Sequence, residues 1–105
     1  MAPSLKHEHA RLTGSRFDDV DLSESVFEDV NLARARFDDV NLSESVFEDV
    51  NFARARFENV ALSDARFKDV NLSRVTIEDA NLEGMTIDGV LVTELFRAYR
   101  ERGAP

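Results

Sequence analysis

Large apolar residues recur at every fifth position along most of this chain. The series comprises Leu12, Phe17, Leu22, Phe27, Leu32, Phe37, Leu42, Phe47, Phe52, Phe57, Leu62, Phe67, Leu72, Ile77, Leu82, Ile87 and Val92. Five residues turn an α-helix through about 500°, so this stripe would wander around a helix axis. On a flat β-strand, an odd period would send successive apolar residues to opposite faces. The period therefore excludes both an amphipathic helix and a flat, half-buried strand.

A chain that turns a corner in every group of five residues removes both conflicts. A small or β-branched residue almost always stands two positions before each member of the series, from Ala10 to Val90. Alternate residues of a short strand point the same way, so both of these positions can face inward. The other three positions then point outward or form the corner. Four corners close a square coil, which predicts a structural period of 20 residues.

The longer period is visible independently as two nearly identical segments. Residues 17–36 and 37–56 differ only where Asp21 corresponds to Asn41 and Leu32 corresponds to Phe52. Residues 57–76 and 77–96 keep the pattern more loosely. Two explanations for the near-identity stay open, namely a recent internal duplication and an engineered insertion of a coil.

Stacked coils would collect like side chains into columns. We expect phenylalanine columns on two opposite sides, formed by Phe17, Phe37 and Phe57 and by Phe27, Phe47 and Phe67. Ser or Ala precedes these rings by two positions and Val mostly precedes the leucines, which indicates volume compensation in a packed core. Phe52 follows Val50 and departs from this rule, so we expect local overpacking or a displaced neighbour there.

The run from Ala10 to Val92 resembles the pentapeptide-repeat family, whose motif is roughly Ala/Ser/Val, Asp/Asn, Leu/Phe and two polar residues. The stretches VNLAR at 30–34 and VNLSR at 70–74 match that motif directly. The resemblance implies an all-β solenoid, a right-handed quadrilateral β-helix of about four coils. It implies no single activity, because one fold hosts many functions. The Asn column at 31, 51 and 71 is expected to bond backbone at the corners.

We divide the chain into an N-terminal tail or cap (1–9), the β-helix (10–92), and a C-terminal capping helix and tail (93–105). Thr93 suits a helix N-cap. The helix is expected to lie across the last coil, because an open solenoid end exposes apolar surface and unpaired strand edges. An alternative role for the same helix is a dimer surface built on Phe96 and Tyr99.

The outward positions predict columns of like charge on a chain whose formal net charge is −8. The candidate acidic face comprises Asp18, Asp38, Glu58 and Glu78 in one column, and Asp19, Asp39 and Asp79 in a second. Two arginine columns accompany it, at 16, 36 and 56 and at 34, 54 and 74. One interpretation is a solvated surface that keeps the chain soluble. The other is DNA mimicry, because family members linked to quinolone resistance are understood to act on DNA gyrase in this way.

Nothing in the sequence assembles a catalytic, cofactor or metal site. The chain has no cysteine, and its carboxylates are expected on a convex surface rather than in a pocket that shifts pKa values. We therefore expect a non-catalytic structural or protein-interaction module with an unknown protein partner, which is a monomer or a weak end-to-end dimer. The acidic charge argues against direct nucleic-acid binding. No apolar run nears the roughly 20 residues of a membrane span, so a cytoplasmic protein is expected by default.

Overall fold

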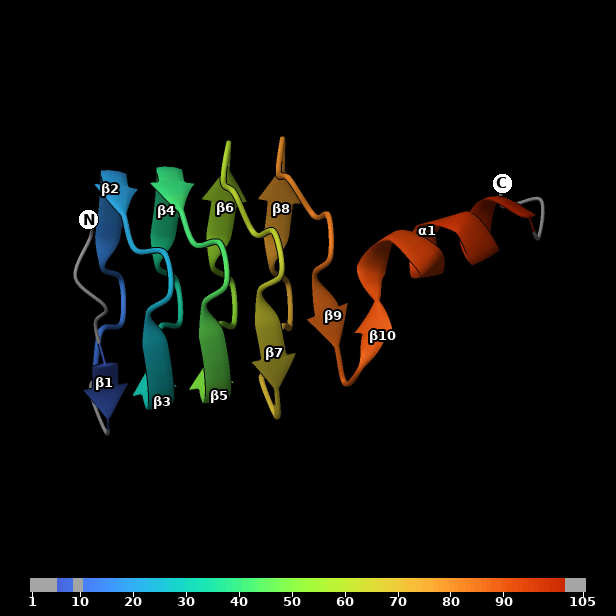
Figure 1. The fold of residues 1–105 in the computed structure, drawn as a ribbon. Helices are drawn as coiled ribbons and strands as arrows, with labels where there is room; N and C mark the ends of the chain where they lie inside the picture. Colours follow the sequence, from blue (N-terminus) through green and yellow to red (C-terminus); the bar gives the residue numbers. More distant parts are fainter. Residues whose placement is uncertain (1–5, 9–10, 102–105) are drawn as a thin grey trace.

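The computed structural model, which describes residues 6–8 and 11–101, is a β-solenoid of about four coils that ends in one helix (Figure 1). The first five strands are β1 (Lys6–Glu8), β2 (Arg16–Asp21), β3 (Val26–Asn31), β4 (Arg36–Asn41) and β5 (Val46–Asn51). Shorter strands follow, namely β6 (Arg56–Glu58), β7 (Arg66–Lys68), β8 (Thr76–Glu78), β9 (Thr86–Ile87) and β10 (Val90–Leu91). Helix α1 spans Val92–Glu101.

From β1 to β9, successive strands alternate between two sheets, and β10 joins the sheet of β9. One sheet has the order β1-β3-β5-β7-β9-β10, and the other has the order β2-β4-β6-β8. From β1 to β9 every pair is parallel and joins a residue to its equivalent 20 positions later, as Phe17 pairs with Phe37. The predicted square coil and its 20-residue period are therefore confirmed.

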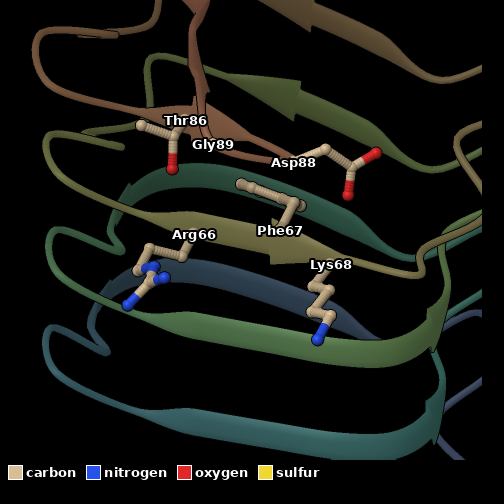
Figure 2. Close-up of a pocket in the computed structure, with 6 residues that line it drawn as sticks. All are labelled: Arg66, Phe67, Lys68, Thr86, Asp88 and Gly89. Carbon is tan, nitrogen blue, oxygen red and sulfur yellow. The ribbon is translucent and has the colours of Figure 1, made fainter.

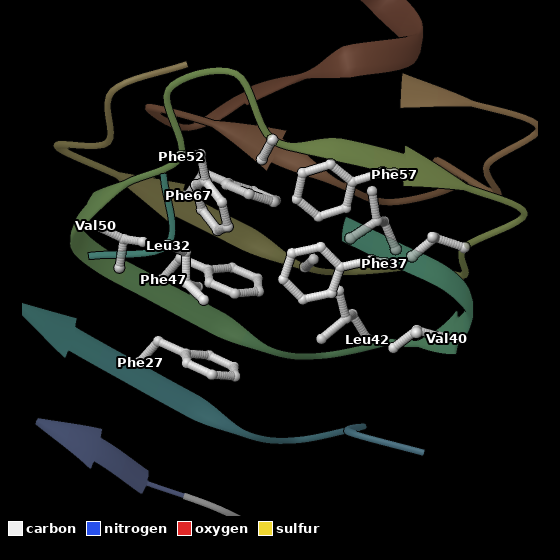
Figure 3. Close-up of a cluster of buried hydrophobic side chains, with 14 of the residues drawn as sticks. Phe27, Leu32, Phe37, Val40, Leu42, Phe47, Val50, Phe52, Phe57 and Phe67 are labelled. Carbon is white, nitrogen blue, oxygen red and sulfur yellow. The ribbon is translucent and has the colours of Figure 1, made fainter. Parts of the chain in front are cut away.

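The centre of the core is formed by the predicted phenylalanine columns, and leucines, valines and alanines pack around them (Figure 3). Phe37 is fully buried, and its ring centroid lies 4.8 Å from that of Phe17 and 4.6 Å from that of Phe57. On the opposite side, Phe47 lies 5.0 Å from Phe27 and 4.6 Å from Phe67. Each inner ring thus contacts a ring above and a ring below, so the coils hold one another in register.

Phe52 fills the space between the two phenylalanine columns. It is fully buried and meets Phe47 at 5.1 Å and Phe57 at 5.5 Å, with interplanar angles of 67° and 61°. Edge-to-face packing of this kind is favourable for aromatic rings. Beside it, the Phe47–Phe67 stack opens to 22°, whereas the Phe27–Phe47 stack one coil earlier is at 9°. The larger side chain is accommodated by edge contacts and a tilted neighbour.

The corners depend on left-handed backbone at every fifth residue. From Asp19 (φ 54°) to Asp79 (φ 52°), the residue two positions after each large apolar residue of the five-residue series has a positive φ. Asp and Asn tolerate this conformation best among residues with side chains, which explains their frequency there. The Asn column is confirmed as structural: Oδ1 of Asn31, Asn51 and Asn71 accepts the backbone N–H two residues on, at 2.9–3.0 Å.

The C-terminal end departs from the expected arrangement. Asp88 (φ 50°) and Gly89 (φ 81°) form a tight turn that places β10 antiparallel to β9. Helix α1 continues directly from β10 and points away from the coils (Figure 1). It begins at Val92 rather than after Thr93, because Val92 is buried and its N–H donates to the Met85 carbonyl. The expectation that the helix lies across the last coil is therefore wrong, and β10 covers the edge of the larger sheet instead.

Candidate functional site

The first candidate column of carboxylates lies along the outer face of the β2-β4-β6-β8 sheet. The register pairs Asp18 with Asp38, Asp38 with Glu58, and Glu58 with Glu78. Each of these residues follows an inward-pointing residue of the Phe17 column, so strand alternation directs its side chain to solvent. The structure thus brings together all four members of this predicted column.

The second candidate column occupies the left-handed corner positions of the same sheet. Asp19, Asp39 and Asp79 are exposed and have φ values of 54°, 55° and 52°. Asn59 interrupts the column, and its side-chain amide donates a hydrogen bond to the Asp39 carboxylate. Asn59 therefore relieves the repulsion that an uninterrupted carboxylate column would create.

An arginine column shares this face with the carboxylates. Arg16, Arg36 and Arg56 pair in register two positions before the first carboxylate column, so their side chains point to the same side of the sheet. Within residues 11–101, these guanidinium groups form no ion pair with that column; the ion pairs there join Arg97 to Glu94 and Glu101. The face is therefore a set of parallel stripes in which acidic groups outnumber basic ones.

The carboxyl group of Asp21, beside these stripes, has a lowered pKa. The backbone N–H of Ser23 donates to Oδ1 of Asp21 at 3.0 Å, and the Ser23 hydroxyl donates to the same atom at 2.7 Å. These two hydrogen bonds favour the ionised form and lower the pKa of Asp21. Asn41 makes the equivalent backbone contact to Ser43 one coil later. The carboxylate of Asp21 thus makes the same corner hydrogen bond that the side-chain amide oxygen of asparagine makes in other coils.

The opposite sheet carries a shallow groove where the regular coils meet the terminal hairpin (Figure 2). It has a volume of about 340 Å³ and is lined by Arg66, Phe67, Lys68, Thr86, Asp88 and Gly89. Lys68 stands in register with Glu48. We did not predict this groove, although the change from Val46 to Arg66 and from Glu48 to Lys68 in one strand position was visible in the sequence.

Neither this groove nor a second hollow assembles a recognisable reaction centre. The second hollow, of about 350 Å³, is lined by Asp39, Val40, Asn41, Asn59, Val60, Ala61, Asp79 and Asn81. It lies where Ala61 stands between the longer side chains of Asn41 and Asn81. Among the residues that the structure describes, no group of three or more His, Cys, Asp or Glu side chains could hold a metal ion. In the same residues, no helix is long and apolar enough to cross a membrane.

The exposed large hydrophobic side chains of the described chain gather at the C-terminal end. They are Ile77, Val90, Leu91, Leu95, Phe96 and Tyr99. The two residues of the candidate dimer surface, Phe96 and Tyr99, are 46% and 59% exposed on one side of α1. On the other side of α1, Arg97 donates to Glu101 and Glu94, and the bond to Glu101 is the main reason that its pKa is raised. We call these six hydrophobic residues the C-terminal patch.

The chain is similar to one protein family and to several solved structures. A family model for the pentapeptide repeat region matches residues 8–88. No curated protein sequence matches the chain. Among solved structures it is similar to HetL, a pentapeptide repeat protein involved in heterocyst differentiation regulation from the cyanobacterium Nostoc sp. strain PCC 7120. The TM-score is 0.53 and the identity 23%, over 82% of this chain and 42% of HetL.

Two further solved structures are also similar to this chain. Rfr23 from the cyanobacterium Cyanothece 51142 matches with a TM-score of 0.37 and 22% identity, over 80% of this chain and 57% of its own. QnrB1, a plasmid-mediated fluoroquinolone resistance protein, matches with a TM-score of 0.35 and 15% identity, over 78% of this chain and 55% of its own. The chain thus spans about two fifths to three fifths of these relatives, and the likeness to HetL shows the fold alone.

Proposed function

The chain belongs to the pentapeptide-repeat family, and from that premise we propose that it is a non-catalytic protein-interaction module that presents its acidic face to a basic protein surface. Here the acidic face is the outer side of the β2-β4-β6-β8 sheet with its two carboxylate columns. The observation that carries the proposal is the strict register of those columns, in which Asp18, Asp38, Glu58 and Glu78 stand one above another.

Such a face suits recognition better than chemistry. The stacked coils hold the carboxylates at steps close to the ring spacing of the core, which is 4.6–4.8 Å beneath this sheet. Rows of fixed charge steer an oppositely charged partner and set its register, and they add more to association rate and specificity than to raw affinity. Catalysis instead needs an enclosed site that excludes water and alters pKa values.

DNA mimicry is a more specific form of the same interaction. A DNA-binding groove is lined by Lys and Arg that neutralise phosphates. The acidic face offers it seven carboxylates in two parallel lines, from Asp18, Asp38, Glu58 and Glu78 and from Asp19, Asp39 and Asp79. The arginine stripe alongside distinguishes this face from a nucleic-acid backbone, so a partner that accepts it must also present acceptors for Arg36 and its column neighbours.

The test measures inhibition of DNA gyrase supercoiling and, in parallel, binding to a panel of basic DNA-binding proteins at low and moderate salt. The test variant replaces Asp18, Asp38 and Glu58 by Asn, Asn and Gln. Its control replaces Arg34, Arg54 and Arg74 by Gln, because that column occupies a different side of the coil. The unmodified chain is expected to bind at least one basic protein, and this binding is expected to weaken as the salt concentration rises. The carboxylate variant is expected to bind less tightly, by about tenfold for each 1.4 kcal/mol of interaction free energy that it loses.

The outcomes separate the alternatives. Gyrase inhibition that the carboxylate variant abolishes and that DNA competes away supports mimicry. Binding to basic proteins without gyrase inhibition supports a more general interaction module. Salt-independent binding that survives the carboxylate substitutions, or no binding across the panel, would rule out the acidic face as the interaction surface.

A further inference from the structure

The groove beside the terminal hairpin interrupts a row of apolar side chains on the outer face of the larger sheet. Residues 20 positions apart stand side by side there, which places Val26, Val46, Arg66 and Thr86 in one row. The antiparallel pair of Thr86 with Leu91 adds Leu91 to it, because directly paired residues of neighbouring strands share a face. The row therefore runs from apolar to polar and back to apolar across β3, β5, β7, β9 and β10.

Arg66 is a cation that this row leaves uncompensated. Its side chain is exposed, and within the residues that the structure describes no ion pair joins it to a carboxylate. Its two neighbours in the row, Val46 and Thr86, are uncharged. A guanidinium with a hydroxyl beside it offers several hydrogen-bond donors, and the planar guanidinium matches a carboxylate in a bidentate geometry. This end of the groove is therefore suited to a carboxylate.

The other end of the groove is balanced in charge. Figure 2 shows Arg66 and Thr86 at one end and Lys68 and Asp88 at the other. Lys68 pairs in register with Glu48, and Asp88 stands 20 positions after Lys68, so Lys68 has an acidic residue in the coil on each side. The excess positive charge of the groove is therefore centred on Arg66 rather than on Lys68.

We infer that this row binds an extended segment of a partner protein that carries one acidic residue between two apolar ones, in the pattern apolar-x-acidic-x-apolar. The carboxylate binds between Arg66 and Thr86. The apolar side chains contact Val46, which is half-buried, and Leu91, a member of the C-terminal patch that is 41% exposed. Both contacts remove apolar surface from water.

The spacing of the row matches this pattern. Neighbouring strands lie about 4.8 Å apart, so Val46 and Leu91 are each about 7 Å from the midpoint between Arg66 and Thr86. Alternate residues of an extended chain point to the same side and are separated by about 6.6 Å. A segment that crosses the strands thus places its acidic residue at the midpoint and its two apolar residues at the contacts on either side.

The surroundings of the row restrict the charge of its partner. Glu28 and Glu48 lie two positions along the same strands as the two valines, and Asp88 lines the groove. A polyanion such as a nucleic acid would be repelled by these carboxylates, whereas one carboxylate reaches Arg66 between uncharged neighbours. The row also lies on the sheet opposite the acidic face, so this inference does not depend on the proposed function.

The first experiment measures binding of labelled nine-residue peptides to the full chain by fluorescence anisotropy. The test peptide has leucine, aspartate and leucine at its third, fifth and seventh positions, with serine and glycine elsewhere. One control replaces the aspartate by asparagine, and a second has the same composition with the three residues consecutive. The test peptide is expected to bind at least about tenfold more tightly than either control, because only it combines the charged hydrogen bonds with both apolar contacts.

The second experiment compares variants of the protein with the test peptide. Arg66→Gln is expected to weaken binding by at least about tenfold. Lys68→Gln is the matched control, because it removes the same charge from the same strand and the same groove, and it is expected to bind nearly as the unmodified chain does. Val46→Thr keeps the shape of the side chain and is expected to weaken binding by a smaller factor. Unchanged far-ultraviolet circular dichroism establishes that each variant is folded.

Three results would overturn the inference. The first is no binding of the test peptide at concentrations up to about 1 mM, the range of very weak complexes. The second is an equal loss in Arg66→Gln and Lys68→Gln, which would indicate attraction to positive charge in general. The third is displacement of the peptide by an equal concentration of inorganic phosphate, which would indicate a site for any small anion. Substitution of Asp18, Asp38 and Glu58 is expected to leave peptide binding unchanged, so this inference and the proposed function can fail separately.

Discussion

The two nearly identical coils at 17–56 and the last turn at 76–91 use the same five-residue pattern, yet the structure treats them differently. In the duplicated coils, Phe37 and Phe47 are completely buried between rings from both neighbouring coils. In the last turn, Ile77 occupies the same column as Phe37 but is 36% exposed. An inward-pointing side chain in this fold is therefore buried mainly by the side chains of the two neighbouring coils, and less by those of its own coil.

The lengths of the strands differ between the duplicated coils and the last turn in the same way. β2 to β5 have six residues each, whereas β6 to β8 have three and β9 and β10 have two. In the last turn the parallel ladder ends in an antiparallel hairpin. Stability in such a molecule is approximately a sum of coil terms and neighbour terms, so the middle coils hold most of it.

The largest expected effect comes from removing a central ring. Phe37→Ala is expected to lower the free energy of unfolding by about 3–5 kcal/mol, because it deletes two ring stacks and leaves a cavity. Ile77→Ala, in the same column, is expected to lower it by about 1 kcal/mol, since its side chain is already partly hydrated. Urea denaturation followed by far-ultraviolet circular dichroism measures both. Equal losses would mean that the terminal coil is as well packed as the middle ones.

The turn that ends the ladder is the next most sensitive point. Gly89 has a φ of 81°, and a Cβ there would meet no atom within 4 Å, so the expected loss in Gly89→Ala is purely conformational, at about 1–2 kcal/mol. Gly14→Ala is the control, because Gly14 has a φ of 73° and equal space but lies at an ordinary corner. If the hairpin holds the open end, only the Gly89 variant increases amide exchange in β9. Equal exchange in both variants would remove that role.

A smaller difference is expected between two serines of one column. The hydroxyl of Ser45 donates to the Leu22 carbonyl at 3.1 Å, whereas the buried hydroxyl of Ser25 has no partner among the residues that the structure describes. Ser45→Ala is expected to lose about 1 kcal/mol, and Ser25→Ala to be neutral or slightly stabilising. Ala65 in the same column shows that alanine fits there. A loss in Ser25→Ala as large as that in Ser45→Ala would indicate that Ser25 finds a partner in solution.

The smallest effect is a pH dependence at one corner. Hydrogen bonds from Ser23 lower the pKa of Asp21 below its ordinary value of 3.8 in the folded chain. The resulting stabilisation is present above that ordinary value and is lost as the pH falls through the lower folded pKa. Asp21→Asn keeps the corner, as Asn41 does, and is expected to remove this part of the acid sensitivity. Identical unfolding midpoints for both proteins between pH 5 and pH 2, about the titration range of a carboxyl group, would contradict the assignment.

The period of five was enough to predict the square coil, its 20-residue register and the phenylalanine columns, because the inward positions follow from strand geometry alone. The acidic columns followed from the same register. The left-handed corner positions were not predicted, since Glu24 and Arg34 occupy them as well as Asp and Asn, and composition therefore marks them weakly.

The C-terminal end was misjudged for a different reason. The C-terminal helix was correctly predicted, but periodicity contains no information about the direction in which a helix leaves the coil. The Asp88–Gly89 pair was a recognisable signal for a tight hairpin turn and would have predicted that β10 reverses direction. That reversal decides where the helix goes.

Because the register is 20 residues, the length of the molecule depends directly on its number of coils. Each added coil would move the terminal hairpin outward by one step of about 4.8 Å, the spacing of neighbouring strands, without altering the hairpin or the helix. The near-identity of residues 17–36 and 37–56 shows a unit that can be copied whole at one point of the chain. Length can therefore change in whole increments while both ends of the molecule keep their chemistry.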